Sequence, residues 1–421
     1  MMISYPKKLE KIFSELHKHS IKPIIVGGYV RDTFLNRSSK DIDIELYNID
    51  SLQKVSKILE KFGSVNSVGK SFGVLKLNYE DLELDFSLPR LDSKVEEGHK
   101  GFKITINTSL TFKEAASRRD FTINAIGYDV ISKTVLDPYN GINDLKEKIL
   151  RAVDLQKFGE DPLRVLRGVG FATRFCLQMQ KDLFDHSKAM IKQGVLQELP
   201  KERIFEEIKK ILLRSQKPSK AFYLLRDLLA FEYFFDEFQK LSTEDLSTVL
   251  TRVDRSLKIF KNETKKEKII IMLALLSSKF SLHDQEKFLE KLTNEKELLK
   301  SITIFTQIQF DLFNLTDYAI YKLATKVEIA LYIPYLLASH PTQKEAIEEL
   351  EQRAKDLNVF HKPLTPLIKG RDLIASGLKP SQEFSKILDE LYEDQMKGLF
   401  STKEEALQLL PILSQNMHLI F

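Results

Sequence analysis

Segments that resemble β-strands are confined to one part of this 421-residue chain, from about residue 21 to residue 150. Short runs rich in apolar and β-branched residues indicate strands at 24–26, 42–46, 73–77, 82–86 and 103–106. Helical stretches, notably 51–62, separate them. After about residue 150, apolar residues recur with helical spacing to the end of the chain. The sequence therefore predicts a small domain of strands and helices, followed by an all-helical remainder.

The composition narrows the class of protein. Hydrophobic residues make up 43% of the chain, and the net charge of +4 permits a local basic surface without establishing nucleic-acid binding. The single cysteine, Cys176, excludes an internal disulfide and a cysteine-based zinc site, and we expect it to be a small buried residue in a reducing setting. The first 20 residues predict an amphipathic helix instead of a signal peptide, and no apolar run is long enough to span a bilayer. We expect a soluble, cytoplasmic protein.

The stretch 24–45 contains the residue types of a phosphate and metal site. A strand-like run ends at Gly27 and Gly28, whose lack of side chains lets backbone N–H groups approach a phosphate. Asp41 and Asp43 follow on a second strand, where the alternation of side chains places both carboxylates on the same face. Together they suit a divalent metal that bridges to a nucleoside triphosphate. Taken singly, the glycines can be only a turn and the aspartates an exposed strand edge.

Two further segments offer groups for the same chemistry. Asp85, within 83–90, is either a third carboxylate or an outward-facing strand residue. The segment SRRDFTINA at 117–125 offers arginines for phosphate and hydrogen-bonding groups for a ribose, or is a solvated basic turn. The segment 137–145, with Asp-Pro and Asn-Gly, indicates a turn that leads into a helix.

The segment 159–171 predicts a helix with a polar face. Asp161 precedes a proline and fits an N-cap, and Asp161, Arg164 and Arg167 recur every three residues along one face. An Asp acceptor beside an Arg fork can read the hydrogen-bonding edge of a base; the alternative is a capped helix with a local ion pair. The segment 201–212 predicts an amphipathic helix whose role is packing.

In this order, the segments resemble the motifs of the class II tRNA nucleotidyltransferases, the CCA-adding enzymes, and of their bacterial poly(A) polymerase relatives. The motifs are VGGYVRD at 26–32, DID at 41–43, GKSFGVLKL at 69–77, RRDFTINA at 118–125, DPYNGINDL at 137–145, EDPLRVLR at 160–167 and ERIFEEI at 202–208. Residues 366–406 resemble the C-terminal region of the family, and 215–360 match no motif.

The resemblance implies an α+β nucleotidyltransferase head with a mixed sheet, followed by an all-α neck, body and tail. It implies a catalytic head at 1–150, a helical neck for base recognition at 151–215, and a helical body and tail for tRNA binding at 216–421. The segment 91–107, with Gly98 and Gly101, resembles the flexible loop that assists the switch from C to A.

The implied activity is the addition of C, C and A to the tRNA 3′ end from CTP and ATP, without a nucleic-acid template. Asp41 and Asp43 would hold Mg²⁺, which assists attack of the 3′-OH on the α-phosphate, and Asp85 would be a third catalytic carboxylate. Asp161 and Arg164 would read the base edge. The implied nucleotide-binding residues are Gly27, Gly28, Arg31, Arg119, Asp120, Asn124, Asp161, Arg164 and Arg167.

The implied macromolecular partner is tRNA, gripped at its acceptor arm and 3′ end, with no membrane and no obligate protein partner. Candidate phosphate contacts, each also readable as an ordinary solvated charge, are Lys209, Lys210, Arg214, Lys217, Lys220, Lys265, Lys266 and Lys268.

The chain departs from the family pattern in places. Gly170 stands where many relatives carry an arginine, and His283-Asp284 lacks the partners of a phosphohydrolase metal site, so we expect no phosphohydrolase activity. GKSFG at 69–73 replaces the Arg-rich stretch typical of poly(A) polymerases, which favours the tRNA enzyme. The alternatives are an enzyme that adds only CC, only A or a poly(A) tail, and a catalytically silent RNA-binding relative, against which the intact Asp-x-Asp argues.

Overall fold

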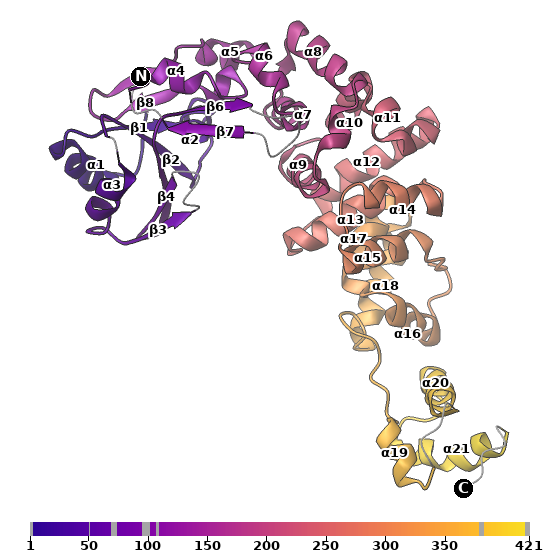
Figure 1. Ribbon diagram of the computed structural model, residues 1–421. Helices are drawn as coiled ribbons and strands as arrows, with labels where there is room; N and C mark the ends of the chain where they lie inside the picture. Colours follow the sequence, from indigo (N-terminus) through magenta and orange to yellow (C-terminus); the bar gives the residue numbers. More distant parts are fainter. Residues whose placement is uncertain are drawn as a thin grey trace. The chain divides into compact units, whose positions relative to one another are not determined.

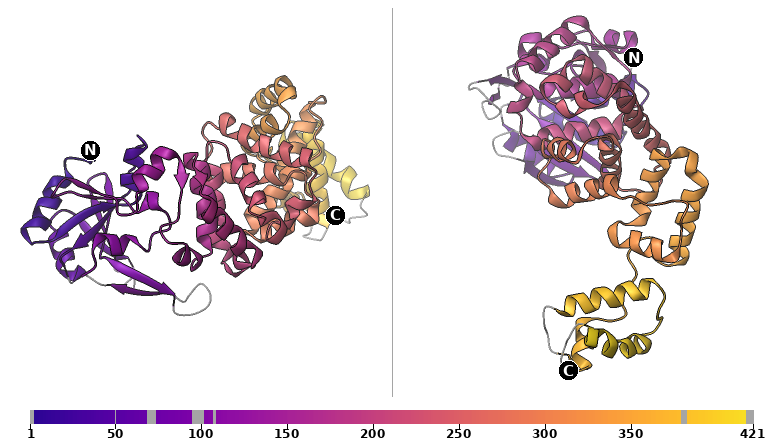
Figure 2. Two further views of the ribbon diagram at one scale, coloured as in Figure 1. Left: turned by 90° about the horizontal axis from the view of Figure 1, so that it is seen from above. Right: turned by 90° about the vertical axis from the view of Figure 1, so that its right-hand side faces the viewer.

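The protein divides into two compact units, Met1–Gln239 and Lys240–Phe421. The computed structural model describes residues 3–49, 51–68, 74–94, 102–106, 109–378 and 383–416. Strands occur only in the first unit of this described part, and the second unit is built from helices (Figures 1 and 2). These observations confirm the predicted fold class, a mixed sheet with helices followed by an all-α region.

The first unit is centred on a seven-stranded sheet with the order β3-β4-β5-β2-β1-β8-β9. The parallel pair β2–β5 makes the sheet mixed, because the other neighbours are antiparallel. Three strands were not predicted, because β3 is largely polar and β8 and β9 contain three residues each. The strands are β1 (Lys22–Val26), β2 (Ile42–Tyr47), β3 (Ser64–Val68), β4 (Val74–Tyr79), β5 (Leu82–Ser87), β8 (Gly127–Asp129) and β9 (Thr134–Leu136).

Helices α1 (Leu9–Lys18) and α3 (Leu52–Leu59) pack against each other and against the sheet. The predicted N-terminal amphipathic helix is confirmed as α1, which buries Leu9, Ile12, Phe13 and Leu16. The helix predicted at 51–62 is confirmed as α3, whose N-cap Ser51 accepts a hydrogen bond from the N–H of Gln53. Helix α2 (Gly28–Phe34) follows β1 directly and contacts both β1 and β2.

A separate two-stranded antiparallel ribbon is formed by β6 (Arg90–Lys94) and β7 (Phe102–Ile106). The ribbon includes part of the segment 91–107, which resembles the flexible loop of the family. Gly98 and Gly101 of that segment lie outside the described residues, and so does the segment 69–73. The expected turn at 137–145 is confirmed, because Asn140 has a left-handed backbone and the side chain of Asp137 accepts from two N–H groups at the start of the next helix. The remaining elements here are α4 (Phe112–Ala116), η1 (Thr122–Asn124), α5 (Gly141–Glu147), β10 (Ile149–Leu150) and β11 (Gln178–Met179).

Helices α7 and α9 belong to the helical part of the first unit that follows the sheet. Helix α7 packs along α9, and an aromatic cluster of Phe121, Phe158 and Phe171 joins α7 to the domain that carries the sheet. Cys176, expected to be buried, is exposed because it ends α7 with a left-handed backbone. The helices are α6 (Leu155–Gly159), α7 (Leu163–Phe175), α8 (Lys181–Lys192), η2 (Val195–Glu198), α9 (Lys201–Arg214), α10 (Ser219–Asp227), α11 (Ala230–Tyr233) and η3 (Asp236–Lys240).

The second unit surrounds helix α13, whose first turn is charged and whose residues from Ile269 to Ser277 are all buried. Helices α12, α15 and α17 pack around it. In the described part of the chain, no helix is long and apolar enough to cross a membrane. The helices up to the tail are α12 (Thr243–Ile259), α13 (Lys265–Ser277), α14 (Leu282–Glu290), α15 (Lys296–Gln307), α16 (Asp317–Lys326), α17 (Ile329–Ser339), η4 (Pro341–Gln343) and α18 (Lys344–Asp356).

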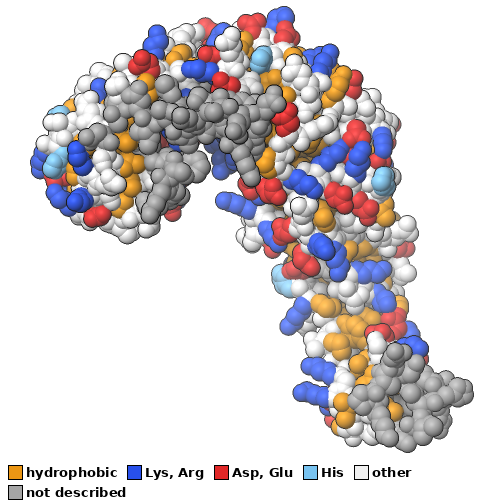
Figure 3. Space-filling view, viewed as in Figure 1, with side chains coloured by type: hydrophobic (Ala, Val, Ile, Leu, Met, Phe, Trp, Pro, Cys, Tyr) orange, Lys and Arg blue, Asp and Glu red, His pale blue; other side chains and the backbone are white. Residues whose placement is uncertain are grey.

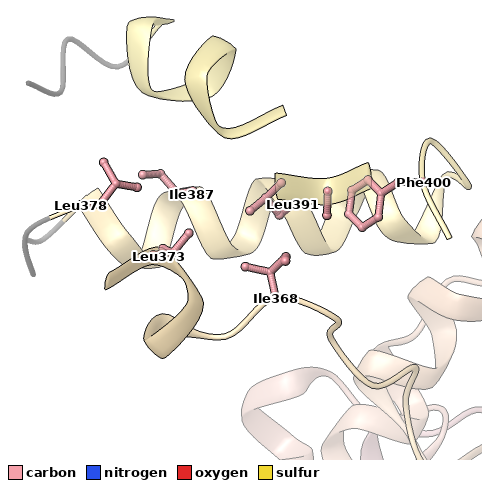
Figure 4. Packing of buried hydrophobic residues seen from close by; sticks show 7 residues of the cluster. Ile368, Leu373, Leu378, Ile387, Leu391 and Phe400 are labelled. Atoms are coloured by element: carbon pink, nitrogen blue, oxygen red, sulfur yellow. The ribbon is translucent and has the colours of Figure 1, made fainter. Parts of the chain in front are cut away.

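The C-terminal helices α19 (Gly370–Ala375), α20 (Glu383–Met396) and α21 (Lys403–Asn416) have a small core of their own. Figure 4 shows its side chains converging between α19 and α20, among them Leu373 and Leu391. Glu393 of α20 accepts from Lys322 of α16 at 2.8 Å and from the hydroxyl of Tyr318, which ties this part to the rest of the unit.

Candidate active site

A cavity of about 460 Å³ lies within the first unit, between the sheet and helices α7 and α9. Seven arginines and three aspartates line it, so its wall carries a surplus of positive charge suited to a polyanion. Most of the predicted site residues are among its lining. The lining residues are Gly27, Gly28, Arg31, Asp43, Arg90, Arg118, Arg119, Asp120, Asn124, Asp161, Leu163, Arg164, Arg167, Phe171 and Arg203.

The predicted carboxylates lie side by side on one face of the sheet. Asp43 on β2 is directly opposite Asp85 on β5, and Asp41 lies two residues before Asp43. Desolvation of the carboxylate by the surrounding protein raises the pKa of Asp43. The positive charge of Arg119 opposes this shift, and the negative charges of Asp85 and Asp41 add to it. Asp85 also forms an ion pair with Lys76 at 3.3 Å. Only Asp43 of the three lines the cavity.

Gly27 provides a close approach and a turn. Its φ of +70° is in the left-handed region, and a Cβ at this position would lie 2.8 Å from Nη1 of Arg119, so a side chain would displace that arginine. Its N–H donates to the carbonyl of Ile126 at 3.1 Å. The N–H of Gly27 is thus engaged within the protein, and what this glycine offers the cavity it lines is the space left by its missing side chain.

A continuous chain of hydrogen bonds forms the floor of the cavity. Arg31 donates to Asp32 through Nε and Nη2, at 2.8 and 2.7 Å, and to Oδ1 of Asn124 through Nη1, at 2.5 Å. Asn124 in turn donates to Oδ1 of Asp120 at 2.9 Å. Oδ2 of Asp120 accepts from Nε and Nη2 of Arg167, at 2.8 and 2.5 Å. This chain, hereafter the floor network, joins α2, η1 and α7.

Charge complementarity keeps the floor network ionised. Burial raises the pKa of Asp120, but the charge of Arg167 and the hydrogen bonds from Asn124 and Arg167 outweigh it, so the pKa lies below the usual range. The charge of Asp120 likewise raises the pKa of Arg167. Asp120 and Arg167 therefore form a charged pair whose geometry is fixed by two donors on one oxygen.

Glu45 holds the tandem arginines of the predicted basic segment. It lies on β2 two residues after Asp43, it is almost completely buried, and its Oε1 accepts from Nη2 of Arg118 at 3.1 Å. Nη2 of Arg119 approaches the same oxygen at 3.8 Å, and the hydroxyl of Tyr47 donates to Oε2 at 2.7 Å. The charge of Glu45 thus offsets two arginines that line the cavity.

Asp161, Arg164 and Arg167 line the cavity together, as the helical spacing predicts. Asp161, however, forms its ion pair with an arginine of α9 and not with one of α7. The side chain of Asp161 accepts from the N–H of Leu163 at 3.1 Å, which confirms the predicted capping bond. Its other oxygen faces Nη2 of Arg203 on α9 at 3.4 Å, and not Arg164. Arg164 donates to the carbonyl oxygens of Lys157 and Arg118, both at 2.8 Å, which fixes its side chain across the cavity.

Residues 24–151 match the family described as the Poly A polymerase head domain, and residues 176–241 match the one described as "Probable RNA and SrmB- binding site of polymerase A". A relative named "Multifunctional CCA protein" from Xylella fastidiosa is 34% identical over 224 residues, which is 52% of this chain and 51% of the relative. The protein of the same name from Nitrosomonas eutropha is 37% identical over 216 residues, or 51% and 50%. The N-terminal half of the chain is thus similar in sequence to the Poly A polymerase head domain family and to the multifunctional CCA proteins.

The chain spans about half the length of the curated relatives it matches. Solved structures are similar over much more of it. One described as "The structure of CCA-adding enzyme apo form II" has a TM-score of 0.70 at 20% identity and covers 97% of this chain and 96% of its own. A "tRNA nucleotidyltransferase complexed with a primer tRNA and an incoming ATP analog" has a TM-score of 0.66 at 22% identity, covering 83% and 99%. At this identity the likeness establishes the fold.

Several residues that line the cavity were missed by sequence reasoning. Arg203 lies in the ERIFEEI motif, which we interpreted only as packing; its apolar neighbours Ile204 and Phe205 are indeed buried, whereas Arg203 lines the cavity. Glu45 continues the period-two series that begins with Asp41 and Asp43, so the alternation alone predicts it on the same face. Arg90 and Phe171 enter the cavity from elements whose packing the sequence does not reveal.

The metal expectation rests on few protein ligands. Among the residues that the structure describes, no group of three or more His, Cys, Asp or Glu side chains is arranged to hold a metal ion. In the second unit, Asp284 next to His283 is committed elsewhere, because its carboxylate accepts from the hydroxyl of Ser281, the N-cap of α14, and binds Lys240. A divalent cation at Asp41 and Asp43 would therefore need further oxygen ligands from a bound substrate.

Proposed function

We propose that the chain is a template-independent tRNA nucleotidyltransferase that adds C, C and A to the tRNA 3′ end from CTP and ATP. The observation that carries the proposal is the single cavity that brings Asp43 of the sheet together with Asp161 and Arg164 of α7, within a wall of arginines. Carboxylates suit the transfer chemistry, arginines the triphosphate, and an Asp–Arg pair the base. The names of the relatives and the complexes of similar structures with ATP, CTP and tRNA support it.

We propose the catalytic head at 1–150, the base-recognition neck at 151–215, and the tRNA-binding body and tail at 216–421. The cavity supports the first two, since it is lined from both. Of the lysines proposed for tRNA contact, three are engaged in ion pairs within the chain. These are Lys209 with Glu206, Lys210 with Glu207 and Lys266 with Glu295. The proposal includes a cytoplasmic location and no obligate protein partner.

The residues present fit a divalent cation held by Asp41 and Asp43. Both carboxylates are open to solvent, and with Asp85 they form a concentration of negative charge on one sheet face. Mg²⁺ is commonly held by one or two carboxylates together with substrate phosphates, which suits a site with so few protein ligands. When bound, it would supply activation of the 3′-OH and stabilisation of charge on the phosphates.

We assign the remaining roles from the contacts. Gly28, Arg118 and Arg119 would surround the triphosphate, because they line the cavity next to Asp43. Asp161 and Arg164 would present an acceptor and a donor to the base edge. Arg31, Asp120, Asn124 and Arg167 are bonded to one another in the floor network, so we propose that they fix the shape of the cavity beneath the nucleotide.

The test is nucleotide incorporation by the purified protein with Mg²⁺ and a tRNA lacking its last three nucleotides. We expect two additions from CTP, one more when ATP is present, and then a stop. Stopping after CC, or adding only A, would identify a partial enzyme, and a long A tract a poly(A) polymerase. Absence of incorporation would favour a silent RNA-binding relative and overturn the proposal.

Two variants test the residue roles. Asp41→Ala should abolish incorporation while tRNA binding is retained, and unchanged activity would contradict the metal assignment. Arg164→Ala should impair discrimination between CTP and ATP more than metal dependence. If selection were unchanged, the base-reading role would be wrong.

A further inference from the structure

Beside the cavity, three arginines surround a single phenylalanine. The guanidinium carbons of Arg31, Arg37 and Arg174 lie 4.6, 4.9 and 4.7 Å from the ring centroid of Phe175. The ring is buried at the C-terminal end of α7, so it orients the guanidinium groups by stacking. Three like charges around one side chain are costly unless anions neutralise them.

The protein supplies too little negative charge for this cluster. Asp32 is committed to Arg31 at 2.7 Å, and its second oxygen is 3.9 Å from Nη2 of Arg174. Arg37 donates to the backbone carbonyl of Arg174, and in the described part of the chain it forms no ion pair with a carboxylate. Burial lowers the pKa of Arg174, and the nearby charges of Arg31, Arg214 and Arg37 lower it further. The end of α9 brings Arg214 to this cluster, because the hydroxyls of Thr173 and Ser215, the residues next to Arg174 and Arg214, lie 3.1 Å apart. Among the described residues, Asp32 is the carboxylate that pairs with the cluster, and it does so through Arg31 and Arg174.

The cluster lies next to the proposed reaction centre. Arg31 and Phe171 line the cavity, and Phe171 stacks on Phe175 with 5.8 Å between ring centroids. Arg37 precedes Asp41 by four residues, a length of chain that spans at most about 14 Å. An anion held by Arg37 would therefore be within reach of the carboxylates that act on the 3′-OH.

We propose that Arg37, Arg174 and Arg214 form a binding site for a backbone phosphate of the single-stranded RNA 3′ end that is to be extended. This proposal rests on the proposed function and adds the place where the primer is held. Guanidinium forks suit a phosphate diester, whose two non-bridging oxygens can each accept hydrogen bonds from more than one arginine. The triphosphate of the nucleotide has its own arginines, Arg118 and Arg119, inside the cavity. The primer must reach the same metal from outside, where Arg37 and Arg214 are exposed.

The experiment compares Arg37→Gln and Arg214→Gln with Arg226→Gln. Arg226 is a matched control, because it is an exposed arginine of the same unit that stacks on an aromatic ring, Tyr223, but is paired with Asp227. We would measure the Kd for tRNA lacking its 3′ CCA without nucleotide, over a range of salt concentrations, and the KM values for that tRNA and for CTP. Thermal unfolding checks that each variant folds.

Each cluster variant should weaken tRNA binding about five- to tenfold and reduce the salt slope by about one, whereas the KM for CTP and the control should be unchanged. Unchanged tRNA binding and salt slope in both folded variants would overturn the proposal. A rise in the KM for CTP alone would also overturn it, by assigning the cluster to the triphosphate. Because binding is measured without catalysis, a wild-type protein that incorporates nothing would contradict the proposed function and still test the cluster.

Discussion

Buried carboxylates are used differently in the two units. In the first unit, Asp120 and Glu45 are buried against arginines that line a cavity. In the second unit, Asp284 accepts from the hydroxyl of the N-cap Ser281 and binds Lys240. Asp372 accepts from a backbone N–H at the start of α19 and binds Lys403, and both lysines are partly exposed. On the face drawn in Figure 3, basic and acidic side chains are interspersed over the helices of the second unit. Charge that is buried, paired and turned toward a cavity thus distinguishes the candidate active site from charge that only stabilises helices.

The largest expected effect comes from Asp43→Asn. It removes a charge from the carboxylates proposed to hold the metal, and we expect kcat/KM to fall at least about a thousandfold in incorporation assays. The matched change in the second unit, Asp284→Asn, removes the charge that binds Lys240 and should lower the melting temperature slightly while activity remains near that of the wild type. If Asp43→Asn retained more than a tenth of the activity, the comparison would fail.

Asp120→Asn tests the buried ion pair of the floor network. The change leaves Arg167 without its buried counter-charge, and we expect a loss of about 3 kcal/mol in the free energy of unfolding by urea, with a raised KM for CTP. Asp372→Asn, which loses its charged contact with Lys403, should be less destabilising and should not change that KM. Equal losses in the two variants would show that the two kinds of buried carboxylate do not differ.

Glu45→Gln sharpens the comparison because it keeps the shape of the side chain. Removing the charge weakens the hold on Arg118 and Arg119, so we expect about a tenfold rise in the KM for CTP and ATP with a smaller change in kcat. Glu393→Gln in the second unit disrupts the contacts with Lys322 and Tyr318 and should leave both KM values unchanged. An unaltered KM in Glu45→Gln would mean that the tandem arginines do not need this anchor.

The smallest effect is a pH dependence of stability. The pKa of Asp120 is lower in the folded state than its unfolded value of about 3.9, so its contribution is complete above that pH and is lost as the pH falls through the lowered folded pKa. The difference in unfolding free energy between the wild type and Asp120→Asn should therefore narrow as the pH is lowered from 6 to 3. A difference that stays constant would contradict the assignment of this charge to the folded state.

The parts of the site that the sequence predicted are those set by short-range geometry. The alternation on β2 placed Asp41 and Asp43 on one face, and the Asp–Pro pair placed a cap at Asp161. Helical spacing also put Asp161 and Arg164 on one face, but the observed partner of Asp161 is Arg203, 42 residues away. The approach of α9 to α7 depends on tertiary packing, which no local pattern encodes. The same holds for Arg90. Of the two outer strands of the sheet, β3 is too polar and β9 too short to be predicted from a local pattern.

The floor network has a consequence for folding order. The bond between Arg31 and Asn124 joins positions 93 residues apart, and that between Asp120 and Arg167 joins positions 47 apart. Closing such long loops costs chain entropy that local helix formation does not, so contacts of this kind are late events. Nascent chains that lack α7 would present Asp120 without its counter-ion. Nucleotide affinity would then appear only after long-range closure, which makes it a sensitive kinetic probe of the final stage of folding.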